Sequence, residues 1–166
     1  MLHTSRVNPH RVTQRKTPAH IPPDRLKSLE ISGGAYDFTQ VVLDNVTDLG
    51  LDYLIVIGGD DTLSFATRLH EKGLHLIAIP KTMDNDVPGT EYCIGFSTAI
   101  TRAKELITRQ RTTLGSHERI GVFRIFGRDS GFTALYTAYV CSARCVLPEA
   151  EFDLERLTQV LVEDKR

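Results

Sequence analysis

The sequence lacks an excess of charge of either sign, because 20 lysines and arginines stand against 21 aspartates and glutamates in 166 residues. Without an overall basic field, neither nucleic acid nor a membrane surface is expected as a partner. Every hydrophobic run is too short to span a bilayer, and no signal peptide is recognised. Together with only three cysteines, an odd number, these absences favour a reducing, cytoplasmic setting.

Cysteine pairs suited to a metal are also scarce. Cys141 and Cys145 lie four residues apart, one turn of a helix, but no second cysteine or histidine pair accompanies them. The spacing therefore favours reduced thiols that pack as small core side chains over a zinc site.

What remains is the composition of an ordinary globular protein, with 41% hydrophobic and 25% charged residues. Residues 1–37 contain several prolines, including Pro22 and Pro23, and we interpret them as an irregular N-terminal connection. Residues 38–166 are expected to form one α/β domain.

Hydrophobic periodicity predicts alternating helices and strands in that domain. A helix that begins near Phe38 should end at Gly50, and a second, at residues 62–72, should end at Gly73. Continuous apolar runs at residues 53–57 and 74–79 are typical of strands buried on both faces. Further helices are expected at 97–111, at 133–142 and after Asp153, and further strands at 120–126 and 144–147. This alternation favours a parallel sheet.

Polar motifs follow three of the predicted strands, where α/β proteins bind their ligands. The first, GGDDT at 58–62, combines glycines, carboxylates and a helix start, although an acidic turn that caps the next helix is the favoured explanation when this motif is taken alone. The second, PKTMDNDVPGT at 80–90, packs like charges together, which is costly unless a cation or a proton transfer uses them. A solvated acidic turn is the alternative. The third, FGRDSG at 126–131, is weak by itself.

Taken together and in this order, these motifs and SHERI at 116–120 resemble the successive active-site segments of the phosphofructokinase family. The resemblance implies a three-layer, doubly wound, mostly parallel sheet of the type found in the N-terminal domain of that family, here incomplete. It also implies phosphoryl transfer to the 1-hydroxyl of fructose 6-phosphate. The segment that ends at Arg6 is similar to one that supplies a phosphate-contacting arginine in the family.

The resemblance implies a role for each matched side chain. Asp84 is expected to be the general base for the sugar hydroxyl, and Thr82 and Arg6 to stabilise the transferring phosphoryl group. Asp60 is expected to face Mg²⁺, with Asp86 assisting through water and also binding substrate.

On the sugar side, Gly127 and Arg128 match residues that line the sugar phosphate, and Phe126 stands where methionine is common. Arg119 matches an arginine that reaches the site of a neighbouring subunit, which implies a homo-oligomer with shared sites. A solvated arginine at a strand start is the simpler alternative for Arg119.

Two residues bear on the phosphoryl donor. Members that use ATP generally carry glycine where this chain has Asp61 and Lys81. A carboxylate at position 61 obstructs the path of a nucleotide, and a lysine at 81 can hold a phosphate without an adenosine handle. This pair resembles the pattern of the pyrophosphate-dependent members, and ATP remains the alternative donor. Gly58, Gly59 and Thr62 of the same loop are expected to help bind the phosphate of the donor.

Alternatives of other classes stay open. The family is roughly twice as long or longer, and its opening strand and sugar-binding half are not matched here. We therefore expect either a piece of a longer enzyme or a non-catalytic remnant that binds phosphate ligands or a partner chain. A lipid or NAD kinase relative would explain GGD but neither of the other two motifs.

Overall fold

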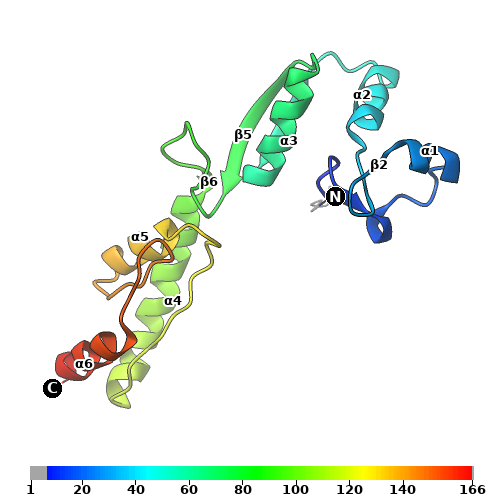
Figure 1. The fold of residues 1–166 in the computed structure, drawn as a ribbon. Coiled ribbons are helices and arrows are strands. Elements are labelled where there is room, and N and C mark those ends of the chain that lie inside the picture. Colours follow the sequence, from blue (N-terminus) through cyan, green and yellow to red (C-terminus); the bar gives the residue numbers. More distant parts are fainter. Residues whose placement is uncertain (1–6, 166) are drawn as a thin grey trace. The chain divides into compact units, whose positions relative to one another are not determined.

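The computed structural model describes residues 7–165 and divides the chain into two compact units, Met1–Pro80 and Lys81–Arg166 (Figure 1). Both contain helices and strands, and the predicted α/β class with a parallel sheet is confirmed. No helix in the described part of the chain combines the length and hydropathy needed to cross a membrane.

The first unit opens with short elements in the stretch that was expected to be an irregular connection. These are β1 (Val12–Thr13), η1 (Gln14–Lys16), α1 (Pro23–Ser28), β2 (Glu30–Ile31) and β3 (Ala35–Tyr36). The three strands form an antiparallel sheet in the order β1-β3-β2. Pro23 suits the first position of α1, because a proline there loses no hydrogen bond that the helix needs. Buried Val12, Ala35 and Phe38 supply the apolar core of this segment.

The predicted helix before Gly50 is α2 (Thr39–Asp48). Gly50 has a φ of 64°, a left-handed conformation that ends a helix at little cost when the residue is glycine. The same holds after the next helix, where Gly73 has a φ of 92°. Both predicted helix ends are therefore confirmed.

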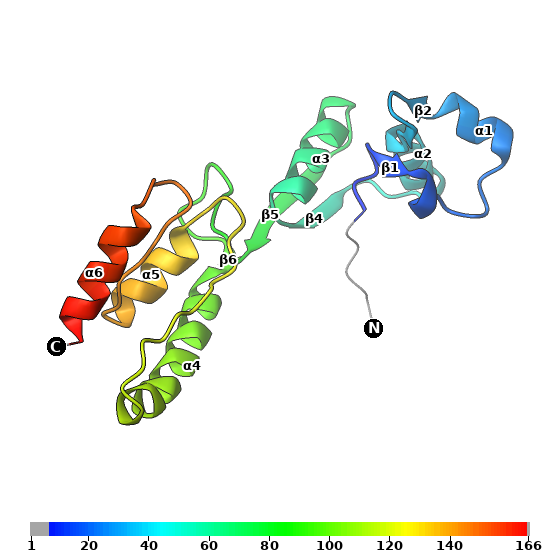
Figure 2. The ribbon, with the colours of Figure 1, turned by 60° about the horizontal axis from the view of Figure 1, so that its bottom comes forward.

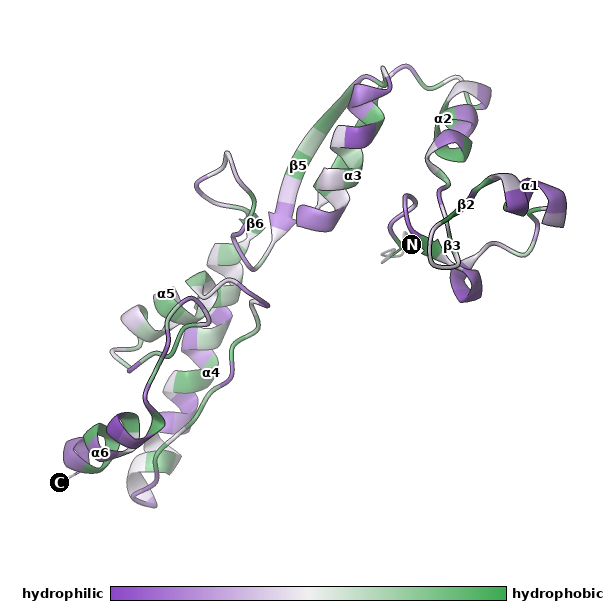
Figure 3. Cartoon of the chain, viewed as in Figure 1, coloured by the Kyte–Doolittle hydropathy of each residue, from purple (hydrophilic) through white to green (hydrophobic). Residues whose placement is uncertain are grey.

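A β-α-β unit follows, made of β4 (Leu54–Gly58), α3 (Asp60–Glu71) and β5 (Leu76–Thr82). The two strands pair in parallel, with Ile55 opposite Ile77. Helix α3 packs on β4, and its Ala66 and Leu69 are buried. Strand β5 is hydrophobic along its first half and becomes hydrophilic at its end (Figure 3).

Among the residues that the structure describes, only one face of this strand pair is covered, so the prediction of strands buried on both faces was wrong. Side chains alternate between the faces of a strand, and the outward set remains in contact with solvent. Ile55 is 62% exposed, Ile57 57% and Ile77 62%. The cause is that α3 covers a single face, whereas parallel sheets normally carry helices on both.

The second unit is built on a long helix. Its elements are the end of β5, β6 (Ile94–Gly95), α4 (Phe96–Ser116), α5 (Phe132–Val140) and α6 (Leu154–Asp164). Helices α4 and α5 pack side by side (Figure 2). Phe96 is fully buried, with its ring 5.4 Å from that of Tyr136 and 5.8 Å from that of Tyr92. Helix α6 begins as predicted, because the side chain of Asp153 accepts hydrogen bonds from two of its first amides.

The strands predicted at 120–126 and 144–147 are absent, and both predictions were wrong. Residues 119–127 run as extended coil beside α4 (Figure 2). A strand exists only when a neighbouring strand accepts its hydrogen bonds, and no described residues pair with either segment. Val122 is accordingly 89% exposed.

Candidate active site

The GGDDT motif lies in the first unit, where β4 ends and α3 begins. Gly59 caps α3, and Asp60 and Asp61 occupy its first turn, a favourable place for negative charge. The space above Gly58 is taken, since a Cβ on this residue would lie 2.4 Å from the Cβ of Thr62. Gly58 therefore allows Thr62 to pack against the strand end, and the Asp60 and Asp61 side chains stay exposed.

The PKTMDND motif lies at the end of β5, and the second unit begins at its lysine, Lys81. Lys81 and Thr82 pair in parallel with the two residues of β6, Ile94 and Gly95. The Lys81 side chain is exposed. The hydroxyl of Thr82 accepts a hydrogen bond from the amide of Asp84 at 3.1 Å, which turns the chain as it leaves the strand.

Asp84 is the buried carboxylate of this loop, only 8% exposed. Its Oδ1 has no hydrogen-bond partner among the described residues, an unusual state for a buried carboxylate oxygen. Burial raises the pKa of Asp84 above its ordinary value, and the negative charge of Asp86 raises it further. The hydroxyl of Thr82 and the positive charge of Arg128 oppose this rise without cancelling it.

Asn85 holds the far side of the loop. It adopts a φ of 54°, in the left-handed region that asparagine tolerates better than most residues. Its Oδ1 accepts a hydrogen bond from the amide of Cys93 at 2.8 Å, and its Nδ2 donates to the carbonyl of Glu91 at 3.1 Å. The Asn85 side chain thus joins the loop to the segment that leads into β6.

The FGRDSG motif forms a tight turn before α5. The amide of Ser130 donates to the carbonyl of Gly127 at 2.9 Å, and Arg128 has a φ of 52°. Only glycine fits at 127, because a Cβ there would lie 2.3 Å from the Ser130 carbonyl oxygen. A carboxylate oxygen of Glu149 accepts the Gly131 amide at 2.6 Å and so satisfies a free donor at the start of α5.

This turn contacts the Asp84 loop through two hydroxyls. Ser130 Oγ donates to the carbonyl of Asp84 at 2.7 Å, and Thr133 Oγ1 donates to the carbonyl of Met83 at 2.5 Å. The second and third motifs therefore contact each other, and the positive charge of Arg128 acts to lower the pKa of Asp84. Sequence reasoning gave Ser130, Thr133 and Asn85 no role.

The other predicted site residues lie as follows. Arg119 follows α4, with its amide bonded to the carbonyl of Leu114 at 2.9 Å and its side chain exposed. Phe126 is 66% exposed beside the buried Gly127. Arg6 lies outside the described residues.

The carboxylates implied for Mg²⁺ are Asp60 and Asp86, both exposed. Within residues 7–165, no group of three or more histidine, cysteine, aspartate or glutamate side chains is placed to hold a metal ion. Magnesium prefers carboxylate oxygens and often binds through one or two of them while substrate phosphates and water complete its shell. Exposed carboxylates such as these fit that mode of binding.

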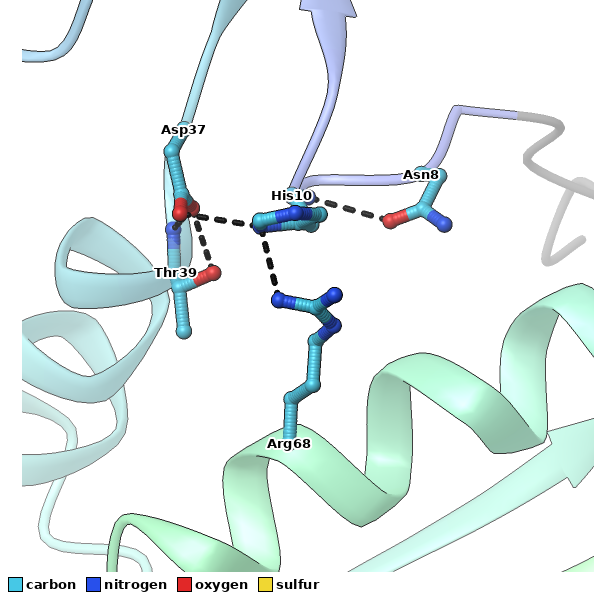
Figure 4. Close-up of polar contacts among 5 residues, drawn as sticks. All are labelled: Asn8, His10, Asp37, Thr39 and Arg68. Carbon is cyan, nitrogen blue, oxygen red and sulfur yellow. Dashed lines mark hydrogen bonds and ion pairs between the residues drawn. The ribbon is translucent and has the colours of Figure 1, made fainter. Parts of the chain in front are cut away.

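A polar cluster in the first unit was not anticipated (Figure 4). His10 Nδ1 lies 2.9 Å from Asp37 Oδ2, and Arg68 Nη1 of α3 lies 3.3 Å from the same histidine nitrogen. The amide and hydroxyl of Thr39 donate to Asp37 Oδ1 at 2.8 and 2.5 Å. This cluster ties the chain before β1 to the start of α2 and to α3.

Comparison with known proteins reveals relatives of both donor types. The chain is 45% identical over 119 residues to the ATP-dependent 6-phosphofructokinase of Natranaerobius thermophilus, covering 71% of this chain and 37% of that protein. It is 50% identical over 104 residues to the pyrophosphate–fructose 6-phosphate 1-phosphotransferase of Thermoproteus tenax, covering 62% and 31%. The chain thus spans about a third of the length of these two relatives.

Solved structures of phosphofructokinases and a model of that family also match this chain. The crystal structure of Pichia pastoris phosphofructokinase in the T-state matches 74% of this chain and 15% of that chain, with 25% identity and a TM-score of 0.66. The structure of phosphofructokinase from Saccharomyces cerevisiae matches 63% and 17%, with 26% identity and a TM-score of 0.57. The model of the family described as Phosphofructokinase matches residues 1–166. The chain therefore belongs to the phosphofructokinase family.

Proposed function

We propose that this chain, as part of a longer enzyme, transfers a phosphoryl group from pyrophosphate to the 1-hydroxyl of fructose 6-phosphate. The observation that carries the proposal is Asp84, a buried carboxylate in a loop held by hydrogen bonds, with one oxygen unpartnered among the described residues. The curated relatives include proteins named for each donor at similar identity, so the choice of donor depends on particular residues.

Asp84 removes the proton from the sugar hydroxyl as that oxygen attacks the terminal phosphorus of pyrophosphate. The bond from this phosphorus to the bridging oxygen breaks, and orthophosphate leaves. A carboxylate whose pKa is raised by burial and by Asp86 is a stronger base than an exposed one. The hydroxyl of Thr82 hydrogen-bonds the transferring group. Arg128 and Gly127 bind the sugar phosphate, and Arg119 serves the site of a neighbouring subunit in an oligomer. Mg²⁺ bound near Asp60 and Asp86 would supply positive charge for the phosphate oxygens.

Donor selection is assigned to Asp61 and Lys81. Asp61 stands in the first turn of α3 and carries negative charge, which disfavours a further anionic group and the nucleoside of ATP. Lys81, the second-to-last residue of β5, is exposed, and its ammonium group can hold a phosphate of pyrophosphate. Each residue adds a charge where glycine would add none.

The test supplies the purified product of the gene that encodes this chain with fructose 6-phosphate and Mg²⁺, and with pyrophosphate or ATP. Fructose 1,6-bisphosphate is expected with pyrophosphate. Asp84→Asn should lower the turnover number by about 10²- to 10⁴-fold, the usual contribution of a general base. Asp129→Asn, the same change on the exposed acid of the neighbouring turn, is the matched control and should keep its turnover.

Three results contradict the proposal in different ways. Product from ATP alone reverses the donor assignment. Full turnover by Asp84→Asn removes Asp84 as the base. No product with either donor, from a protein that still binds fructose 6-phosphate, establishes the non-catalytic remnant instead.

A separate substitution tests which phosphoryl donor the enzyme selects. In Asp61→Gly, the ratio of kcat/KM for pyrophosphate to kcat/KM for ATP should fall by about tenfold or more, because an obstructing charge is removed from the path of the nucleotide. Asp52→Gly, at an exposed position before β4, controls for the loss of one carboxylate. An unchanged ratio in Asp61→Gly, measured by steady-state kinetics with both donors, shows that position 61 does not select the donor.

A further inference from the structure

The loop that carries Asp84 is held by its main chain, in addition to any contact of the carboxylate. Two successive carbonyl groups, those of Met83 and Asp84, accept hydrogen bonds from Thr133 and Ser130 at 2.5 and 2.7 Å. The donors are 50 and 46 residues further along the chain. Both hydroxyls therefore fix the path of the backbone at the position of the base.

The two hydrogen-bond donors, Ser130 and Thr133, lie at the well-packed start of α5. Ser130 lies directly before Gly131, the cap of α5, and Thr133 lies in the first turn of that helix. Helix α5 packs against α4, and Thr133 is fully buried. A hydrogen bond shielded from water is stronger than an exposed one, and leaving its carbonyl unpaired is costly.

A second anchor holds the loop from its other side. Asn85 bonds through both atoms of its amide group to the backbone of Glu91 and Cys93. Asp84 is thus flanked by anchored main chain on both sides, while its own Oδ1 has no hydrogen-bond partner among the residues described. The direction of the carboxylate is consequently set by the backbone to a large extent.

We propose that Ser130 and Thr133 are positioning residues, which aim the Asp84 carboxylate at the sugar hydroxyl through the carbonyl groups of Met83 and Asp84. The proposal rests on the proposed function, in which Asp84 is the base. Misplacing a catalytic group by about 1 Å can cost about 10²-fold in rate. A loosened loop should therefore impair the chemical step more than the binding of substrate.

The test compares kcat and KM for fructose 6-phosphate in Ser130→Ala, Thr133→Val and Thr133→Ser, using the purified gene product described above. The valine removes the hydroxyl and keeps the shape of the side chain, whereas the serine keeps the hydroxyl. We expect kcat to fall about 10- to 100-fold in the first two variants, with KM changed less than about twofold, and to recover in Thr133→Ser.

Thr137→Val is the matched control. Thr137 lies one turn further along α5, is equally buried at 2% exposure, and its hydroxyl has no hydrogen-bond partner among the described residues. Its removal should leave kcat unchanged. An equal loss of kcat in Thr137→Val would assign the effect to general packing of α5 and overturn the proposal.

Amide hydrogen exchange gives a readout that is independent of turnover. Loss of one anchoring hydrogen bond should speed exchange of the segment 83–86 by about tenfold in Thr133→Val, with exchange in α6 unchanged. If Thr133→Val and Ser130→Ala leave both kcat and this exchange rate unchanged while Asp84→Asn abolishes turnover, the positioning role is wrong and the proposed function stands. Undiminished turnover in Asp84→Asn overturns both.

Discussion

Asp84 and Asp86 are two residues apart and carry the same chemical group, yet their surroundings differ. Asp84 is 8% exposed, whereas the side chain of Asp86 is exposed. Burial raises the pKa of Asp84, and the charge of Asp86 contributes to that rise. In the proposed function, the buried Asp84 is the base and the exposed Asp86 is a ligand for Mg²⁺.

Asp37 is shifted in the opposite direction. Burial alone would raise its pKa, but the hydrogen bonds from Thr39 and from His10, together with the charge of His10, outweigh burial and hold the pKa below 3.8. In the unfolded chain the pKa returns to that ordinary value. The unfolded state therefore binds the proton first as pH falls, so the stabilisation is present above about pH 4 and is lost as pH falls through the lower, folded value.

We expect Asp37→Asn to lower the free energy of unfolding at pH 7, because Oδ2 can no longer offer a charged acceptor to His10. The difference in the free energy of unfolding between Asp37→Asn and the wild type should narrow as pH falls below about 4. Urea unfolding followed by circular dichroism between pH 3 and 7 measures this free energy. Asp52→Asn controls for the change in net charge, and a difference for Asp37→Asn that stays constant with pH would refute the assignment.

The β4 and β5 strand pair has an inner and an outer face of similar composition. The inner set, which includes Val56, faces α3, whereas Ile55, Ile57 and Ile77 are more than half exposed on the other. Contiguous exposed hydrophobic surface on a sheet favours association with other chains. The outer face therefore predicts a limit to solubility.

The double substitution Ile55→Thr and Ile77→Thr should reduce self-association. Threonine keeps the branched shape that suits a strand and removes apolar surface. Light scattering across a concentration series measures the effect. Val56→Thr, on the face toward α3, is the matched control and should instead lower the urea midpoint, since it places a hydroxyl against the helix. Unchanged scattering in the double variant would show that this face does not drive association.

Helix ends and strand partners differ in how well the sequence predicts them. Gly50 and Gly73 marked their helix ends correctly, because a positive φ is a local requirement of a single residue. The segment at 120–126 has the composition of a strand and is coil, because a strand also requires a partner that local composition does not encode. Asp153 capped α6 as predicted through contacts only two and three residues away.

The candidate site likewise combines features that the local sequence predicts with contacts that it does not. Asp84 and the motif around it were identified from adjacent residues and from their resemblance to a family. Ser130 and Thr133 were not, since their bonds join positions 46 and 50 residues apart, and the His10–Asp37 contact spans 27. Such pairs depend on the three-dimensional path of the chain, which a single sequence does not display.

For the molecule as a whole, family membership is established by a match over residues 1–166, while the curated relatives compared above are about three times as long as the segment they share with it. Family membership is therefore shown, whereas the activity of this chain and the substrates it acts on rest on the proposal. The donor assignment depends on Asp61 and Lys81, and the base on Asp84, so each can be tested by a separate substitution.

Because the Asp84 loop is anchored through its main chain, its shape and its catalytic group can change independently during evolution. Thr133 and Ser130 hold carbonyl groups, which every amino acid carries, so the shape of the loop does not depend on the side chain at position 84. A single nucleotide change in that codon, from aspartate to asparagine, removes the base and leaves the loop in place. After gene duplication, one copy can thus become a receptor for phosphorylated ligands in one mutational step while its sibling remains a catalyst.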